Sequence, residues 1–307
     1  MNKYFTAVIF SLTIMFSSHV NAKPTFYGNS DTEQKSILEK DKLFIALELM
    51  KDEPKEGLDM LKELAETGDR DAQYVLGTFY YDGLGNGEYI EVNAIKAVQW
   101  LKLAAKEDDR DIGQRGGVNA QNEALFYLGN IYHNLVVGDG IVQDFEEAVK
   151  WFKIAANKGH KESQFNLGYM YYKGGYKGIL GKKGITKDKQ EAVIWWSLCA
   201  EQGYVKCQYM MGLAYYKAVA ADGIVQDLHE AAKWFDMAAK QGDKHAQYNL
   251  GVMYYRGKGV PKDLLMAHQL FSLAAAQGDK EARSYKNKVA ERLMKDRMKK
   301  DYSLVQD

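Results

Sequence analysis

The chain has 307 residues, enough for one to three domains, and its 41 Lys and Arg residues balance 41 Asp and Glu residues. A net charge of zero gives no overall field that would favour nucleic acid or an anionic membrane as a partner. Only three prolines interrupt a chain rich in Ala, Leu, Lys, Glu and Gln, which favours a helical protein over a β-sandwich or barrel.

The first 22 residues have the features of a cleaved signal peptide. Lys3 precedes an apolar run from Tyr4 to Phe16, and Val20-Asn21-Ala22 offers small residues where signal peptidase needs them. The run is shorter than the roughly 20 apolar residues that span a bilayer, so we expect no stable membrane insertion. The sequence predicts a periplasmic or secreted protein whose mature chain begins near Lys23.

The rest of the chain divides into three predicted regions. Residues 23–53 are expected to form a helical region that leads into the repeats, and Asp31 to Thr67 has the pattern of a divergent helical hairpin. Residues 54–279 are expected to form a repeat solenoid, with inserts near 106–122 and 173–189. We interpret both inserts as surface loops. Residues 280–307 are expected to form a polar capping helix and tail.

Within 54–279 one segment recurs about every 40 residues. "ESQFNLGYMYYKGG", "KCQYMMGLAYYKAV" and "HAQYNLGVMYYRGKG" are three copies. We align the copies on their glycines, which are Gly77, Gly129, Gly168, Gly212 and Gly251. A second segment follows each copy: "AIKAVQWLKLAA", "FEEAVKWFKIAA", "KQEAVIWWSLCA", "LHEAAKWFDMAA" and "LLMAHQLFSLAA".

Both segments have the periodicity of amphipathic helices. A glycine in mid-helix costs about 1 kcal/mol relative to Ala, so five such glycines predict close helix packing. We expect the Ala-Ala pairs of the second helices to supply the matching small surface. Four further glycines are expected to end second helices in the left-handed conformation. These are Gly159, Gly203, Gly242 and Gly278.

Such hairpins cannot bury their apolar faces alone and must stack. The pattern A-x-Q-Y-N-L-G-x-M-Y-Y-x-G-x-G-V-x-K-D, followed by A-A-x-Q-G-D, resembles the Sel1-like repeat, a longer relative of the tetratricopeptide repeat. The resemblance covers roughly residues 54 to 290. It implies an all-α fold, a right-handed α-solenoid of stacked helical hairpins, whose first helices line the concave face.

Cys199 and Cys207 are the only cysteines. In other repeats the aligned positions carry small residues, which is consistent with the close backbone approach that a disulfide requires. Export would place the pair in an oxidising compartment. Secreted proteins with Sel1-like repeats link repeats at this same spacing, and the resemblance supports a structural disulfide. Two buried free thiols or a redox pair remain alternatives.

The search for catalytic and metal-binding motifs is mostly negative. "HEAAK", from His229 to Lys233, begins like the zinc motif HExxH but has Lys233 where the second zinc ligand belongs. We interpret it as a surface polar pair. Nucleophile and phosphate-binding motifs do not occur, so we expect no enzyme, no cofactor and no metal.

A binding surface remains, and the resemblance places it on the concave face. One row of first-helix residues is Tyr74, Phe126, Phe165, Tyr209 and Tyr248. A second row and its next neighbours are Tyr81, Asp82, His133, Asn134, Tyr172, Lys173, Tyr216, Lys217, Tyr255 and Arg256. From the second row we predict the partner-binding residues Tyr81, His133, Tyr172, Lys173, Tyr216, Lys217, Tyr255 and Arg256, because aromatic residues and Arg dominate binding hot spots. The alternative is that many of these rings are packing residues.

The main functional hypothesis is a non-enzymatic periplasmic or secreted scaffold that binds another protein or peptide. The resemblance also implies two alternatives. One is an immunity protein that neutralises a secreted phospholipase-type effector, and the other is a cell-wall-linked or penicillin-binding protein. The change from Asp82 to Arg256 along the row predicts a ligand of uneven charge.

Overall fold

The computed structural model describes residues 31–85, 87–107, 120–134, 140–175, 184–218 and 223–304. These residues form thirteen α-helices and no β-strand, and an isolated β-bridge joins Leu84 to Ile90. The helices are α2 (Asp31–Asp52), α3 (Pro54–Glu66), α4 (Arg70–Asp82), α5 (Ala94–Ala104), α6 (Ala120–His133), α7 (Phe145–Asn157), α8 (Lys161–Lys173), α9 (Lys189–Glu201), α10 (Val205–Tyr216), α11 (Leu228–Lys240), α12 (Lys244–Arg256), α13 (Leu264–Ala276) and α14 (Lys280–Leu304). The predicted signal peptide and most of the 106–122 insert lie outside the described residues, as does residue range 176–183 of the second insert.

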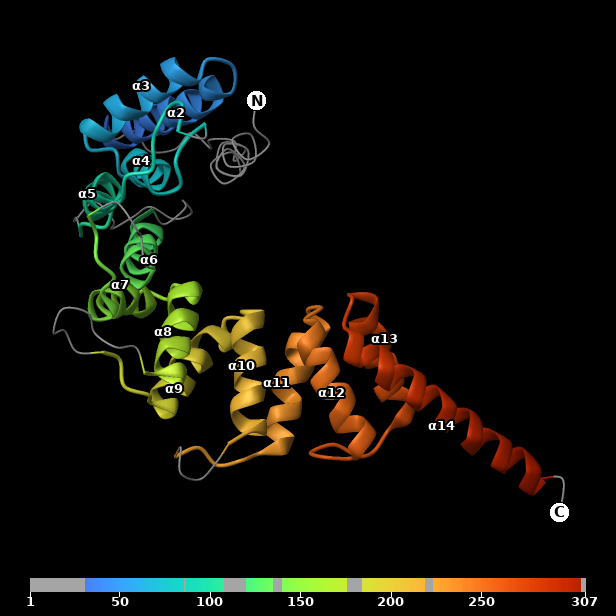
Figure 1. Cartoon of the computed structure of the whole chain (residues 1–307). Coiled ribbons are helices and arrows are strands. Elements are labelled where there is room, and N and C mark those ends of the chain that lie inside the picture. Colours follow the sequence, from blue (N-terminus) through green and yellow to red (C-terminus); the bar gives the residue numbers. More distant parts are fainter. Residues whose placement is uncertain are drawn as a thin grey trace. The chain divides into compact units, whose positions relative to one another are not determined.

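The chain divides into two compact units. Unit 1 contains α2 to α7, and unit 2 contains α8 to α14 (Figure 1). In each unit the first helix of a repeat packs along its second helix, as α6 packs along α7 and α10 along α11. The second helix then packs on the first helix of the next hairpin, as α11 does on α12. The predicted all-α fold of stacked helical hairpins is confirmed.

Each repeat glycine lies beneath a large side chain of its own second helix. A Cβ added at Gly129 or Gly212 would stand 2.5 Å from a ring carbon. The side chains over the five glycines are Leu101, Phe152, Trp196, Phe235 and Phe271, in chain order. The close packing predicted for the glycines is therefore confirmed, but the expected partner was wrong. A fully buried large side chain, not an Ala-Ala pair, fills the space that the missing side chain leaves.

The Ala-Ala pairs pack toward the following hairpin instead. Ala238 of α11 shares a buried cluster with Ala246 of α12, and Ala274 of α13 shares one with Ala282 of α14. All four side chains are fully buried. Small residues at this contact let a second helix approach the next first helix closely.

Buried glutamines join the hairpins through hydrogen bonds. Gln208 of α10 donates to the carbonyl of Ala200 at 3.3 Å, and Gln247 of α12 donates to that of Ala239 at 3.2 Å. Each amide thus adds a hydrogen bond to a carbonyl at the end of the preceding second helix, and that carbonyl also accepts from the backbone N–H of the glycine that follows. Gln277, at the end of α13, donates to the Gln247 side-chain oxygen at 3.0 Å and to the Gly242 carbonyl at 3.0 Å. Gln241 does the same for Gln208 and Gly203, at 2.8 and 3.1 Å.

Asparagine and aspartate side chains set where the helices begin. Asp227, for example, accepts from the backbone N–H of Glu230 at 2.9 Å, and Asp243 accepts from that of Ala246 at 2.7 Å. Second helices end before a left-handed glycine, as predicted; at Gly203 φ is 80°.

The last helix, α14, begins like another first helix. Asp279 caps it through the N–H of Ala282 at 2.8 Å, and Ala282 and Val289 are buried against α13. Asn287 replaces the glycine that α12 has at Gly251, so the notch for a further second helix is missing. A terminal helix with a polar outer face keeps the end of a stack in water.

Candidate functional site

First helices approach one another within each unit. α4 lies against α6 in unit 1, and α10 lies against α12 in unit 2. Among the described helices, no two second helices make an equally extensive contact. In a stack of hairpins, the helices that approach one another line the inner side, so first helices, which carry the predicted binding residues, line this side of each unit.

In unit 1 the predicted aromatic residues belong largely to the core. Tyr74 is buried, and the rings of Tyr74 and Tyr81 both meet Tyr127 edge-on, with centroids 5.8 and 5.9 Å away. Burial raises the pKa of Tyr127 to about 12, and the charges of Asp82 and Glu123 act in the same direction. The predicted residue His133 lies edge-on to Phe145, with centroids 5.7 Å apart. These rings join α4 to α6 and α6 to α7.

In unit 2 the predicted tyrosines pack against aromatic rings of neighbouring helices. Tyr172 lies 5.3 Å from the Trp196 ring, and Tyr216 lies 6.2 Å from that of Phe235. Tyr255 lies 5.9 Å from the Tyr285 ring of α14. All three are half-buried. They therefore hold the helices together and expose only part of each ring, as the alternative interpretation expected.

The predicted cations differ from the rings because they are exposed. Lys173, Lys217 and Arg256 lie at the ends of α8, α10 and α12. In the described part of the chain no carboxylate forms an ion pair with any of them. Lys173 lies 5.8 Å from the centre of the Tyr169 ring.

The sequence analysis missed two residues of this surface. Tyr169 is 39% exposed and stacks on Phe165, with centroids 6.4 Å apart. Lys206 of α10 lies 5.8 Å from the centre of the Phe165 ring. Phe165, Tyr169 and Lys173 are spaced by four residues on α8, and this helical spacing could have identified Tyr169. We call Phe165, Tyr169, Lys173, Lys206, Lys217 and Arg256 the aromatic–cationic surface of unit 2.

The outer side carries a different feature. One position in each second helix holds a large apolar side chain that is 40–53% exposed. These residues are Leu103 and Ile154 in unit 1, and Leu198, Met237 and Leu273 in unit 2. They form the competing surface against which the inner side must be tested.

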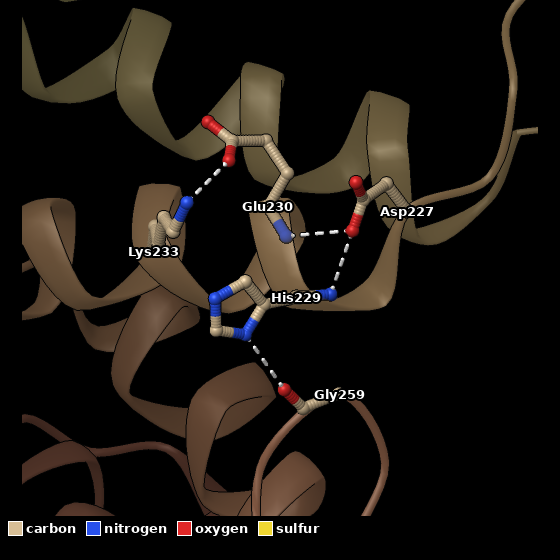
Figure 2. A network of polar contacts seen from close by, with 5 residues as sticks. All are labelled: Asp227, His229, Glu230, Lys233 and Gly259. Atoms are coloured by element: carbon tan, nitrogen blue, oxygen red, sulfur yellow. Dashed lines mark hydrogen bonds and ion pairs between the residues drawn. The ribbon is translucent and has the colours of Figure 1, made fainter.

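The stretch from His229 to Lys233 forms structural contacts. Glu230 pairs with Lys233 at 2.9 Å, and Asp227 caps α11 through the N–H of His229 at 3.0 Å (Figure 2). His229 Nδ1 lies 3.3 Å from the Gly259 carbonyl oxygen in the next hairpin. Gln190 makes the same type of contact one hairpin earlier, donating to Gly223 at 3.1 Å. A repeated contact between hairpins accounts for His229.

Within the described ranges we also looked for metal sites, membrane-spanning helices and clefts with catalytic residues. These ranges contain no cluster of three potential metal-ligating side chains and no helix long and apolar enough to cross a membrane. A shallow cleft of about 230 Å³ in unit 1 is lined by residues that include Tyr80, Glu91 and Lys96. It contains no Ser, Cys or His, so its lining offers no nucleophile–base pair of the kind used in acyl transfer.

The two cysteines are joined where unit 2 passes from α9 to α10. The Cys199–Cys207 disulfide has its Cα atoms 5.8 Å apart, and both residues are fully buried. It takes the place of the small-residue contact between successive hairpins, in agreement with the sequence prediction.

Comparisons with known proteins agree with this architecture. The Sel1 repeat family profile matches residues 70–109, 122–160, 161–204, 205–243 and 244–279. The structure of c5321, a protective antigen present in uropathogenic Escherichia coli strains and displaying an SLR fold, is 29% identical, with a TM-score of 0.68. The match covers 87% of this chain and 53% of c5321, so the chain spans about half the length of that protein.

Two further structures have lower scores. A Sel1 repeat protein from Oxalobacter formigenes is 27% identical, with a TM-score of 0.57 and coverage of 80% of this chain and 86% of that chain. An immunity protein from Pseudomonas aeruginosa is 17% identical over 78% of this chain and 81% of that chain. Its TM-score is 0.38. The comparison with curated proteins gives no match.

Proposed function

The chain belongs to the Sel1 repeat family, and we propose that it is a non-enzymatic scaffold that binds another protein or peptide through the inner side of its hairpins. Sel1 repeat proteins typically take part in protein–protein interactions. The proposed compartment is the periplasm or the outside of the cell, and the buried disulfide between Cys199 and Cys207 is compatible with it.

The aromatic–cationic surface carries this proposal. Rings held by packing lose little further freedom on binding, which makes them favourable contacts for a partner. Lys173, Lys217 and Arg256 add exposed charges at equivalent places in three successive hairpins. No contact among the described residues favours the immunity or penicillin-binding alternatives over a scaffold.

Site-specific photo-crosslinking in the producing cells tests the location of the interface. A crosslinking amino acid at position 173 or 217 should give a discrete protein adduct. The same group at position 150 or 233, on second helices, should give little. Adducts formed only from the outer apolar positions 198, 237 and 273 would place the interface on the other side and contradict the proposal.

A further inference from the structure

In unit 2, two exposed lysines of the second helix α11 differ from two exposed lysines of the first helices in how they are neutralised. On α11, Lys233 and Lys240 each pair with an acid one turn earlier, at 2.9 and 2.6 Å. The first-helix cations have apolar residues there: Met170 and Tyr169 precede Lys173, and Leu213 and Ala214 precede Lys217. Nor does a neighbouring hairpin supply a carboxylate to either lysine within the described part of unit 2.

From this difference we propose that the partner presents an acidic, extended peptide segment to the aromatic–cationic surface. The inference rests on the proposed scaffold function and adds the chemistry of the partner. Carboxylates of the segment meet Lys173, Lys217 and Arg256. Its apolar side chains lie on the stacked rings of Phe165 and Tyr169.

The rings of α8, with one cation from α8 and one from α10, form a mixed site for such a segment. Tyr169 lies close to Lys173, and Phe165 lies close to Lys206, so each ammonium group stands beside an aromatic face. An ammonium beside a ring still has N–H donors available for a carboxylate, because the ring contacts only one side of the ammonium group. A segment with both acidic and apolar residues satisfies both halves of the site.

The spacing of the hairpins favours an extended segment. Directly packed helices lie about 8–10 Å apart, and α10 makes only a slight contact with α12, so the axes that carry Lys217 and Arg256 are separated by about 10 Å or more. A polyproline II chain rises about 3.1 Å per residue with three residues per turn, which brings every third side chain to one face about 9 Å apart. An extended segment can therefore reach from Lys217 to Arg256 with acids about three or four residues apart.

A nucleic acid is the other polyanion that exposed cations attract. The chain as a whole has no net positive charge, and phosphate binding relies on a broad basic field. We therefore assign the surface to a peptide, and the experiment compares peptide binding with oligonucleotide binding.

The test is selection from a random 12-residue peptide library displayed on phage, with the oxidised mature chain as bait. We expect the enriched peptides to be rich in Asp and Glu. The best peptide, made synthetically with a fluorescent label, should bind at least tenfold more weakly to a Lys217→Glu/Arg256→Glu variant. Replacing its acids by Asn or Gln should weaken binding to a similar degree, and added salt should weaken it as well.

A matched control keeps the charge change but moves it to the outer side. Lys233→Glu/Lys240→Glu should alter peptide binding by less than twofold, and both variants should keep the wild-type circular dichroism spectrum. Neutral or basic enriched peptides, or no enrichment, would overturn the inference. So would a labelled 12-nucleotide thymidine strand that binds more tightly than the best peptide.

The two proposals can fail separately. One outcome is a crosslink from position 217 to a natural partner together with selected peptides that lack acids. It would support the scaffold function and contradict the proposal of an acidic segment. Absence of any inner-side crosslink would instead remove the function itself.

Discussion

Gly212 of α10 lies directly under the ring of Phe235 of α11. A Cβ at this glycine would stand 2.5 Å from a ring carbon, and Phe235 is fully buried. The contact joins the two helices of one hairpin, and its equivalents do so in the other repeats. It therefore fixes how each first helix, with its predicted binding residues, packs in the stack.

Gly212→Ala should consequently destabilise the protein although Ala favours helix formation. The gain in helix propensity is about 1 kcal/mol. Overpacking a buried ring costs about 1–3 kcal/mol and sometimes more, so we expect a net loss of about 1 kcal/mol in urea denaturation. The same change in a Phe235→Leu background, which imitates Leu101 of the first repeat, should cost less. Equal losses in both backgrounds would contradict the contact.

Gln247→Leu should lower the free energy of unfolding by about 1–3 kcal/mol, because it removes two hydrogen bonds of a buried amide, one to the Ala239 carbonyl and one from Gln277, each worth about 0.5–1.5 kcal/mol. Gln277→Ala should cost less, since Gln277 is exposed and water can replace it. Chemical denaturation of both variants measures the difference. A larger loss for Gln277→Ala would show that the buried amide is not the main link between these hairpins.

The disulfide should stabilise unit 2 without being essential for its fold. Closing a loop of about nine residues is worth roughly 2–3 kcal/mol in the chain-entropy model. The Cys199→Ala/Cys207→Ala variant should therefore melt at a lower temperature but keep its helical circular dichroism, because Ala238 and Ala246 fill the same two places one hairpin later. Non-reducing mass analysis of the wild type should find no thiol available for alkylation. Free thiols in freshly isolated exported protein would refute the assignment.

Asp82 should make unit 1 less stable at neutral pH than at mildly acidic pH. Desolvation raises the pKa of its carboxyl above the ordinary value, so the folded chain binds this proton more tightly than the unfolded chain. Asp82→Asn should stabilise the protein at pH 7 by less than about 1 kcal/mol, since solvent screens a group at the surface. The gain should shrink as pH falls through the raised pKa and vanish below the ordinary carboxyl range.

Denaturation of both proteins from pH 4 to pH 7 measures that gain. Glu88→Gln, at an exposed carboxyl in the same unit, serves as the control. A gain for Asp82→Asn that stays constant over this range would rule out the carboxyl as its source.

Part of the contact pattern could be read from the sequence and part could not. Five mid-helix glycines predicted close packing, because their cost in helix propensity needs compensation. The choice between Phe235 and an Ala-Ala pair as the partner of Gly212 was beyond the sequence, since both lie on buried faces of the second helix. Gln247 was visible in the repeat pattern, but a single polar residue gives no sign that the next hairpin buries it.

The candidate site shows the same division. Tyr216 was correctly placed on the first helix. Periodicity does not show, however, how much of its ring packs on Phe235 and how much is exposed to a partner. The four-residue spacing from Phe165 could have identified Tyr169, which stacks on it, but no sequence spacing indicates that Lys206 of another helix lies at the Phe165 ring.

The sequence by itself determined the repeat, the helices, their glycine ends and the position of the two cysteines, because each depends on contacts between residues close in the chain. It also contained the acids that neutralise Lys233 and Lys240, one turn away on the same helix. Only the tertiary structure decided that Lys217 meets no described carboxylate from another hairpin. Whether a charge is neutralised depends on every element that folds within a few ångströms of it. Spacing along the sequence identifies only the possible partners on the same helix.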